Sequence, residues 1–161
     1  MSKSKYEITK DGLKKFEEEL EYLKTVKRKE NIQALQEARA QGDLSENAEY
    51  DAARDEQAKI EARISELENI IKNAKIIESD DSDFITADKT VTYKILDSGE
   101  IEKFKIVGSQ EADPFQGKIS INSPVAQALL GHKAQDTVEI FTSSGSYKVQ
   151  ILEVENNKTT D

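Results

Sequence analysis

The sequence ARAQGDLSENAEYDAA, residues 38–53, interrupts a long run of helix-forming residues only once, at Gly42. No other glycine lies between Gly12 and Gly99, and no proline precedes Pro114. Since glycine and proline are the residues that most often end helices, their absence on both sides predicts two helical arms joined at this break. Four acidic residues surround the junction: Asp43, Glu46, Glu49 and Asp51.

Apolar residues recur at intervals of three and four on both sides of the break, which is the seven-residue repeat of helices that pack as a pair. In the first arm they are Leu13, Phe16, Leu20 and Leu23, then Ile32, Leu35 and Ala38 in a shifted phase. In the second arm they are Ala53, Gln57, Ile60, Ile64, Leu67, Ile71 and Ala74. The pattern predicts an antiparallel α-helical coiled-coil hairpin over residues 1–78, with Thr9 capping its first helix and an acidic tip at 42–50.

The second half of the chain changes to a β-type pattern. Segments 91–96 and 101–107 flank the turn at Asp97–Glu100, and further β-rich segments follow at 118–121, 138–141 and 147–154. Between them, Ser123 and Pro124 are suited to begin a short helix that Gly131 would end. The chain is therefore predicted to be α+β, with an acidic linker at 79–83, a compact sheet domain at 84–156 and a tail at 157–161.

Composition excludes several classes of function. There is no cysteine for thiolate chemistry, and a single histidine, His132, cannot form a histidine-rich metal site. Residues 1–80 carry 15 basic and 19 acidic residues and residues 81–161 carry 8 and 13, so neither half is basic and the net charge is −9. Tight non-specific binding to duplex DNA is not expected from such a chain. No apolar run is long enough to span a bilayer or to resemble a signal peptide, so a cytoplasmic protein is expected.

The acidic residues at the break fit two roles. Asp43-Leu44-Ser45-Glu46 has the spacing of a capping box, in which Asp43 caps the second helix and Glu46 reaches back; Ser45 is an alternative cap. The other interpretation is that these carboxylates bind Mg²⁺, because proteins often hold this ion through one or two carboxylates together with phosphate oxygens and water. Asp43 and Glu46 alone are too few for tight binding, so a partner would have to supply the remaining ligands.

The motif GDLSENAEY between two long helices, followed by the later segment ISINSPVAQALLG, resembles the Gre family of bacterial transcript cleavage factors. The resemblance extends from Tyr6 to Val154. It implies a hairpin that enters the secondary channel of RNA polymerase and an FKBP-like C-terminal domain that docks outside the channel. Asp43 and Glu46 match the family's acidic tip residues. They would help the polymerase to hold a shared Mg²⁺ while the backtracked RNA 3′ end is hydrolysed, so that the factor is not itself an enzyme.

The resemblance also assigns roles to residues around the tip and in the second half. Arg39 and Arg54 match positions of a basic patch that faces the extruded RNA, although each could instead pair with a neighbouring acid such as Glu37, Asp51 or Asp55. Asn47 is expected to orient the tip, and Glu49 and Tyr50 to support it, Tyr50 by packing. Ser123 and Pro124 belong to a segment near the polymerase-docking surface, where helix capping is the simpler role.

Three other functions remain open on the sequence alone. A related protein could occupy the same channel and inhibit the polymerase, although the family's inhibitors carry a more heavily acidic tip. The FKBP-like domain could be a peptidyl-prolyl isomerase, which would require an aromatic-lined pocket. The hairpin could also be a structural adaptor whose tip acids only cap a helix. A monomer that contacts polymerase, and nascent RNA through it, is the favoured interpretation.

Overall fold

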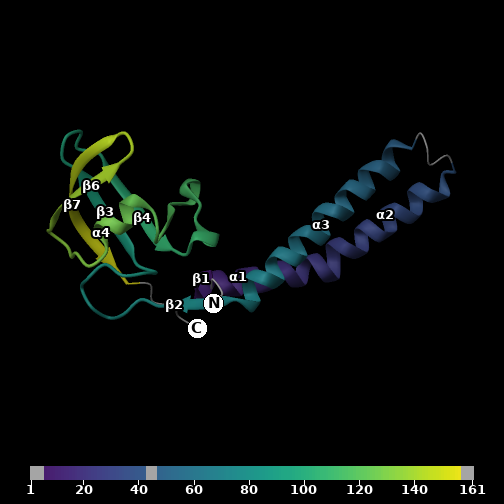
Figure 1. Ribbon diagram of the computed structural model, residues 1–161, viewed down its shortest axis with the longest axis horizontal. Helices are drawn as coiled ribbons and strands as arrows, with labels where there is room; N and C mark the ends of the chain where they lie inside the picture. The colour runs from purple at the N-terminus through teal and green to yellow at the C-terminus, as the bar shows by residue number, and fades with distance from the viewer. Residues whose placement is uncertain (1–5, 43–46, 157–161) are drawn as a thin grey trace, which may run out of the picture. The chain divides into compact units, whose positions relative to one another are not determined.

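The computed structural model describes residues 6–42 and 47–156. Its backbone divides into two compact units, one made of Leu13–Asn73 and the other of Met1–Gly12 with Ala74–Asp161. The first unit is helical and the second is built on a five-stranded sheet (Figure 1). The predicted α+β class, with a helical hairpin before a sheet domain, is confirmed. In the described part of the chain, no helix has an apolar stretch long enough to cross a membrane.

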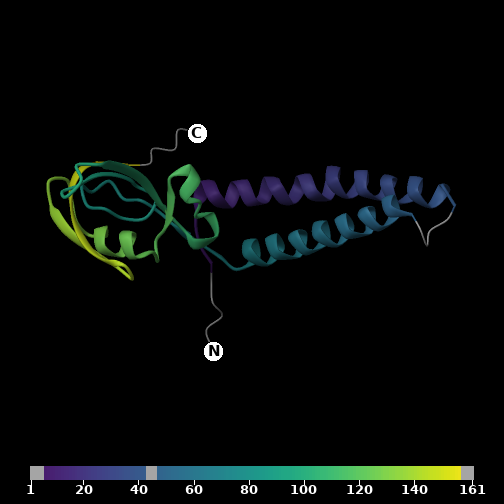
Figure 2. The same ribbon diagram turned by 90° about the horizontal axis from the view of Figure 1, so that it is seen from above.

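The hairpin consists of two arms that run side by side (Figure 2). Helix α1 (Lys10–Tyr22), a π-helical turn η1 (Leu23–Lys27) and α2 (Arg28–Ala40) form the first arm, and α3 (Ala48–Lys72) forms the second. The buried seam residues are Leu35, Ala38, Ala53, Ile60, Ile64, Leu67 and Ile70. Because most charged residues lie outside this seam, apolar burial between the arms is what stabilises the hairpin.

The π-helical turn explains why the apolar repeat of the first arm loses its phase near residue 26. A π turn holds about one residue more than an α turn, so the residues that follow it face the partner helix one position later than the uninterrupted repeat of Leu13, Phe16, Leu20 and Leu23 would place them. Asn31 is therefore buried, whereas Ile32, which the repeat predicts in the seam, is 44% exposed. The prediction for Ile32 is wrong because spacing alone does not reveal the wide turn.

Ion pairs also link the two arms. Arg28 bonds Glu61 through two nitrogens, at 2.9 and 2.8 Å, and Arg63 bonds Glu19 in the same way, at 2.7 and 2.9 Å. The members of both pairs are more than a third exposed, so solvent screens the charges and neither pair contributes much to stability. Their bidentate geometry instead favours one alignment of the arms over its neighbours.

Helix α1 begins in the sheet-containing unit, directly after strand β1 (Tyr6–Thr9). Thr9 is its N-cap as predicted, since its Oγ1 accepts from the Gly12 N–H at 3.0 Å. Thr9 in turn donates to the carboxylate of Glu111 from its N–H at 2.7 Å and from its hydroxyl. A Cβ on Gly12 would lie 2.1 Å from Glu111 Oε1, so glycine leaves the space that this carboxylate occupies.

Strand β1 pairs in parallel with β2 (Ala74–Ile77), so that the two ends of the hairpin sequence form a small sheet of their own. The main sheet has the order β5-β4-β3-β7-β6. Its strands are β3 (Thr90–Ile95), β4 (Ile101–Val107), β5 (Lys118–Ser120), β6 (Thr137–Thr142) and β7 (Gly145–Glu155). Neighbours are antiparallel except β4 and β5, which are parallel because two 3₁₀ turns, Ser109–Glu111 and Pro114–Gln116, carry the chain back between them.

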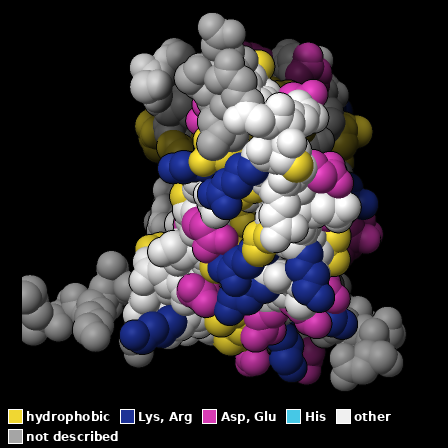
Figure 3. All heavy atoms as spheres, turned by 90° about the vertical axis from the view of Figure 1, so that its right-hand side faces the viewer, with side chains coloured by type: hydrophobic (Ala, Val, Ile, Leu, Met, Phe, Trp, Pro, Cys, Tyr) yellow, Lys and Arg dark blue, Asp and Glu magenta, His cyan; other side chains and the backbone are white. Residues whose placement is uncertain are grey.

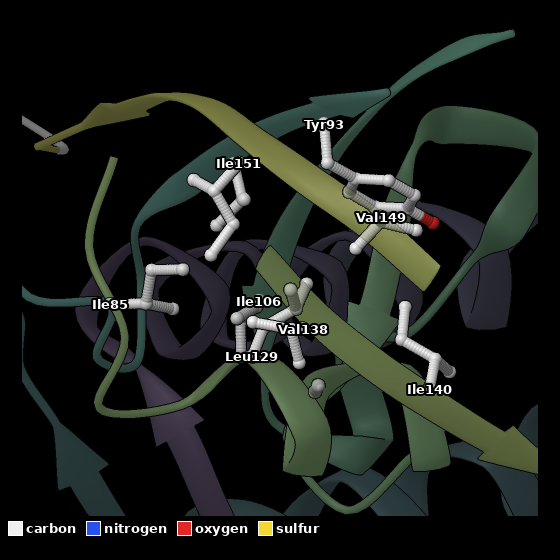
Figure 4. Close-up of a cluster of buried hydrophobic side chains, with 10 residues drawn as sticks. Ile85, Tyr93, Ile106, Leu129, Val138, Ile140, Val149 and Ile151 are labelled. Atoms are coloured by element: carbon white, nitrogen blue, oxygen red, sulfur yellow. The ribbon is translucent and has the colours of Figure 1, made fainter. Parts of the chain in front are cut away.

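One face of this sheet packs against the short helix α4 (Pro124–Leu129) and forms the core of the unit (Figure 4). The sticks in that figure converge from the strands and from α4, and Ile106, Ile140, Val149 and Ile151 are completely buried. Tyr93 lies among them, and burial raises the pKa of its hydroxyl above the ordinary value. Alternating buried and exposed residues along β3 and β6 account for this core.

The segment predicted as a linker is anchored by a buried lysine. Lys89 has no exposed surface, and its Nζ donates to Asp80 Oδ1 at 2.9 Å, to Ser82 O at 2.7 Å and to Phe84 O at 2.7 Å. Hydrogen bonds from Ser82 and the bond from Lys89 lower the pKa of Asp80 to about 2. Because a buried ammonium needs such partners, residues 80–84 are tied to Lys89, the residue that directly precedes β3.

We expect Asp80→Asn to destabilise the protein at neutral pH. The folded-state pKa of Asp80 is depressed from 3.8, so the stability that its charge contributes is present above about pH 4 and is lost as the pH falls toward 2. The difference in unfolding midpoint between wild type and Asp80→Asn should therefore narrow over that range. Asp81→Asn is a matched control at an exposed neighbour, and a difference that stays constant with pH would contradict the assignment.

Candidate functional site at the tip of the hairpin

The first arm ends at a glycine in a conformation that other residues rarely adopt. Helix α2 ends at Ala40, Gln41 is its C-cap, and Gly42 follows with φ +101°. The Gly42 N–H donates to Arg39 O at 3.1 Å, which satisfies one of the last carbonyls of the helix. Gly42, the only glycine between Gly12 and Gly99, therefore stands where the helix of the first arm ends, as the sequence predicts.

The second arm begins at Asn47, which is the N-cap of α3. Asn47 Oδ1 accepts from the Tyr50 N–H at 3.0 Å, and Asn47 Nδ2 donates to Ala38 O at 2.7 Å. One side chain therefore starts α3 and ties it to α2, and its orienting role at the tip stays a prediction. The prediction that Asp43 or Ser45 caps this helix is wrong, because α3 starts at Ala48 and Asn47 fills the cap.

Asp43 and Glu46, the predicted metal ligands, lie outside the described residues. In the sequence they belong to the connection between the C-cap of α2 and the N-cap of α3. Across the described ranges, 6–42 and 47–156, no group of three or more acidic or histidine side chains is placed to hold a metal ion.

The arms approach closely near the tip. Ala38 and Ala53 are 2% and 7% exposed, and the buried Asn31 donates from Nδ2 to Ala53 O at 2.9 Å. Gln41 Nε2 donates to Glu49 Oε2 at 3.1 Å, which joins the ends of the two arms; the supporting role of Glu49 at the tip stays a prediction. Asn31 was missed by sequence reasoning, although its spacing of four from Leu35 places it on the same helix face.

The two predicted RNA-facing arginines meet on one tyrosine. The Cζ atoms of Arg39 and Arg54 lie 5.8 and 5.9 Å from the centroid of the Tyr50 ring, and Arg54 Nη1 bonds Tyr50 Oη at 3.1 Å. Hydrogen bonding from Arg54, and then from Arg39, lowers the pKa of the Tyr50 hydroxyl. Within the described residues neither arginine forms the predicted ion pair with Glu37, Asp51 or Asp55.

On the face seen from the end of the hairpin, the described side chains form no large basic surface. Figure 3 shows Lys and Arg side chains interspersed with Asp and Glu rather than gathered in one field.

The predicted docking residues of the second half have structural roles. Ser123 is the N-cap of α4, with its Oγ accepting from the Ala126 N–H at 3.2 Å, and Pro124 occupies the first turn. His132 is half-buried, and its Nδ1 lies 3.3 Å from Asp136 Oδ2. Phe115 was missed: it is fully exposed on a turn fixed by Asp113, which accepts from the Phe115 N–H at 3.1 Å. Its exposure could not be predicted from the sequence, because a single phenylalanine usually indicates a residue of the hydrophobic core.

Comparisons with known proteins agree with this architecture. The family "Transcription elongation factor, N-terminal" matches residues 6–76, and "Transcription elongation factor, GreA/GreB, C-term" matches residues 80–156. The chain is 54% identical to transcription elongation factor GreA of Bacillus licheniformis over 151 residues, which cover 92% of this chain and 96% of that protein. It is 53% identical to the GreA of Geobacillus kaustophilus over 155 residues, covering 95% and 98%.

Among solved structures, GreA factor homolog 1 of Thermus thermophilus is 30% identical, with a TM-score of 0.44 and coverage of 95% of this chain and 100% of that one. The two family matches together account for almost the whole sequence, in the order in which the hairpin and the sheet domain occur. The matched residues cover nearly the full length of the relatives from Bacillus licheniformis and Geobacillus kaustophilus. This chain is a transcription elongation factor of the GreA/GreB family.

Proposed function

We propose that the protein binds bacterial RNA polymerase, places the tip of its hairpin in the secondary channel, and stimulates the polymerase's own cleavage of backtracked RNA. The observation that supports this proposal is how the first helical arm ends and the second begins at the tip of the hairpin. Gly42 ends one helix and Asn47 begins the next, and the sequence Asp43-Leu44-Ser45-Glu46 connects them. The capping role that would otherwise explain the acidic residues belongs to Asn47.

The length of the arms suits delivery of the tip into a narrow channel. Helix α3 has 25 residues, so it extends about 37 Å at the usual rise of an α-helix. The cap of Asn47 and its bond to Ala38 O hold the two arms together at the far end of this length. A rod of this kind can carry a side chain to a site that a compact domain cannot enter.

The donor set of the tip fits magnesium. Asp43 and Glu46 supply carboxylate oxygens, the ligands that Mg²⁺ prefers, but two of them do not form a complete site. When bound, Mg²⁺ activates a water molecule and neutralises charge on the phosphate that is attacked. The factor's contribution is to provide two anionic ligands at a fixed place, and the remaining ligands come from the polymerase. On this view the protein is an accessory factor, and the nuclease is the polymerase.

The test is to add the purified protein to a stalled elongation complex with Mg²⁺. The RNA should be shortened from its 3′ end and should extend again when nucleotides are supplied, because the cleavage leaves a new end in the active site. Polymerase with Mg²⁺ but without the factor gives the basal rate. If the RNA stays full length, or if extension is blocked, the stimulating role would be excluded and the inhibitor alternative favoured.

No observation favours the other functions considered. A prolyl isomerase would need aromatic rings that converge on a pocket, whereas Tyr93 is buried in the core and Phe104 and Tyr147 pack against it. Phe84, Phe115 and Phe141 are exposed. The interpretation as a purely structural adaptor required the acidic tip residues to cap a helix. The cap of α3 is Asn47 instead, so this interpretation loses its main support.

A further inference from the structure

The cluster of Arg39, Tyr50 and Arg54 joins the two arms just behind the tip. Arg39 lies in the last turn of α2, whereas Tyr50 and Arg54 lie one turn apart on α3. Both guanidinium groups are within 6 Å of the centroid of the same ring, at 5.8 and 5.9 Å, which is the range of a cation–π contact. The ring therefore determines where two side chains from different helices are held.

These arginines differ from the others of the hairpin in what they bind. Arg28 and Arg63 each bond a carboxylate through two nitrogens, so their charge is balanced by Glu61 and Glu19. Among the contacts of the described residues, Arg39 and Arg54 contact the ring of Tyr50 instead. An aromatic ring orients a guanidinium but does not neutralise it, so the pair keeps its positive charge for an anion.

We propose that Tyr50 is a positioning residue that holds Arg39 and Arg54 as one two-armed group for the phosphates of the RNA strand beside the tip. This inference rests on the proposed function. Guanidinium groups bind phosphate oxygens through parallel N–H donors, and holding both groups in advance removes part of the ordering cost of binding. The hydrogen bond of 3.1 Å from Arg54 to the phenol oxygen helps to fix one guanidinium, and the ring contact at 5.8 Å helps to fix that of Arg39.

The proposal is tested by a double-mutant cycle in the stalled elongation complex. Tyr50→Leu removes the ring, Arg39→Gln with Arg54→Gln removes the cations, and a third variant combines all three changes. At saturating factor, Tyr50→Leu should slow stimulated cleavage roughly fivefold, the factor expected for a moderate cation–π contact. The combined variant should be no slower than the arginine variant, because the tyrosine then has nothing to position.

Two further measurements separate positioning from simple support of the helix. Tyr50→Phe keeps the ring and should slow cleavage less than Tyr50→Leu does. The wild-type rate should fall more steeply with added KCl than the rate of Tyr50→Leu, since phosphate contacts weaken as salt rises. Circular dichroism and thermal unfolding check that each variant keeps its helices.

A wild-type rate for Tyr50→Leu would overturn the positioning role. So would a slowing by Tyr50→Leu that is equally large with and without the two arginines, because the tyrosine would then act independently of them. The proposed function has its own readout in the same assay: a wild-type rate for Asp43→Asn would overturn that function, whereas a loss of cleavage by Asp43→Asn with an inert Tyr50→Leu would overturn only the present inference.

Discussion

Asp43→Asn and Glu46→Gln should each reduce stimulated RNA cleavage about a hundredfold or more, since a metal-bound ligand set provides several kcal/mol of transition-state stabilisation. Each change keeps the size of the side chain and removes only its negative charge. Binding to polymerase should remain, because the arms, the cap at Asn47 and the sheet domain are not touched. The measurement is the cleavage rate at saturating factor, with affinity read separately from competition against wild-type protein.

Magnesium dependence makes this prediction more specific. If Asp43 and Glu46 are metal ligands, the Mg²⁺ concentration for half-maximal cleavage should rise in both variants, because removing a charged ligand weakens metal binding. Asp55→Asn is the matched control: it makes the same chemical change at an exposed position of α3 and should leave the rate and the Mg²⁺ dependence unchanged. Normal cleavage by Asp43→Asn and Glu46→Gln would return these residues to a structural role.

The hairpin could be predicted from the sequence because its determinants are local. One glycine in a long helix-forming stretch marks the turn, and intervals of three and four mark the seam. The pattern did not reveal the π-helical turn at Leu23–Lys27, so Ile32 was placed in the seam and Asn31 was not. A widened turn depends on how the arms pack against each other, which spacing in one helix does not record.

The sequence-based predictions mainly omitted contacts between separate segments of the chain. Strands β1 and β2 have four residues each and pair across most of the hairpin sequence, so neither carries a recognisable pattern alone. The anchoring of residues 80–84 by Lys89 was hidden in the same way, since an acidic segment with a serine resembles a solvent-exposed linker. Both features depend on which segments the fold brings together.

The candidate site was predictable in part. The metal role of Asp43 and Glu46 came from resemblance to a family, because their spacing alone favours a capping box. The structure assigns the cap to Asn47, four residues after Asp43. Choosing among Asp43, Ser45 and Asn47 from sequence was not feasible, since all three are good N-caps and the choice depends on where Ala38 O lies.

Asn47→Ala is expected to have the second largest effect on activity. It removes the cap of α3, at a cost of about 1 kcal/mol, and also the 2.7 Å bond to Ala38 O, so both contacts that fix the connection are lost. Stimulated cleavage should fall roughly tenfold to a hundredfold, the loss that a displacement of about 1 Å produces in a positioned catalytic group. Amide hydrogen exchange at Tyr50 should become faster, because its N–H loses its acceptor.

Asn47→Ser distinguishes the two contacts. Serine keeps an oxygen that can accept from the Tyr50 N–H, but it does not provide the amide donor that reaches Ala38 O from Asn47. Slow exchange at Tyr50 with reduced cleavage in this variant would show that the bond between the arms, rather than the cap, positions the tip. If Asn47→Ala stimulated RNA cleavage by the polymerase at the wild-type rate while exchange at Tyr50 increased, the geometry of this helix start would not matter for cleavage. Delivery of the acidic residues would then depend on contacts that the polymerase makes with the tip.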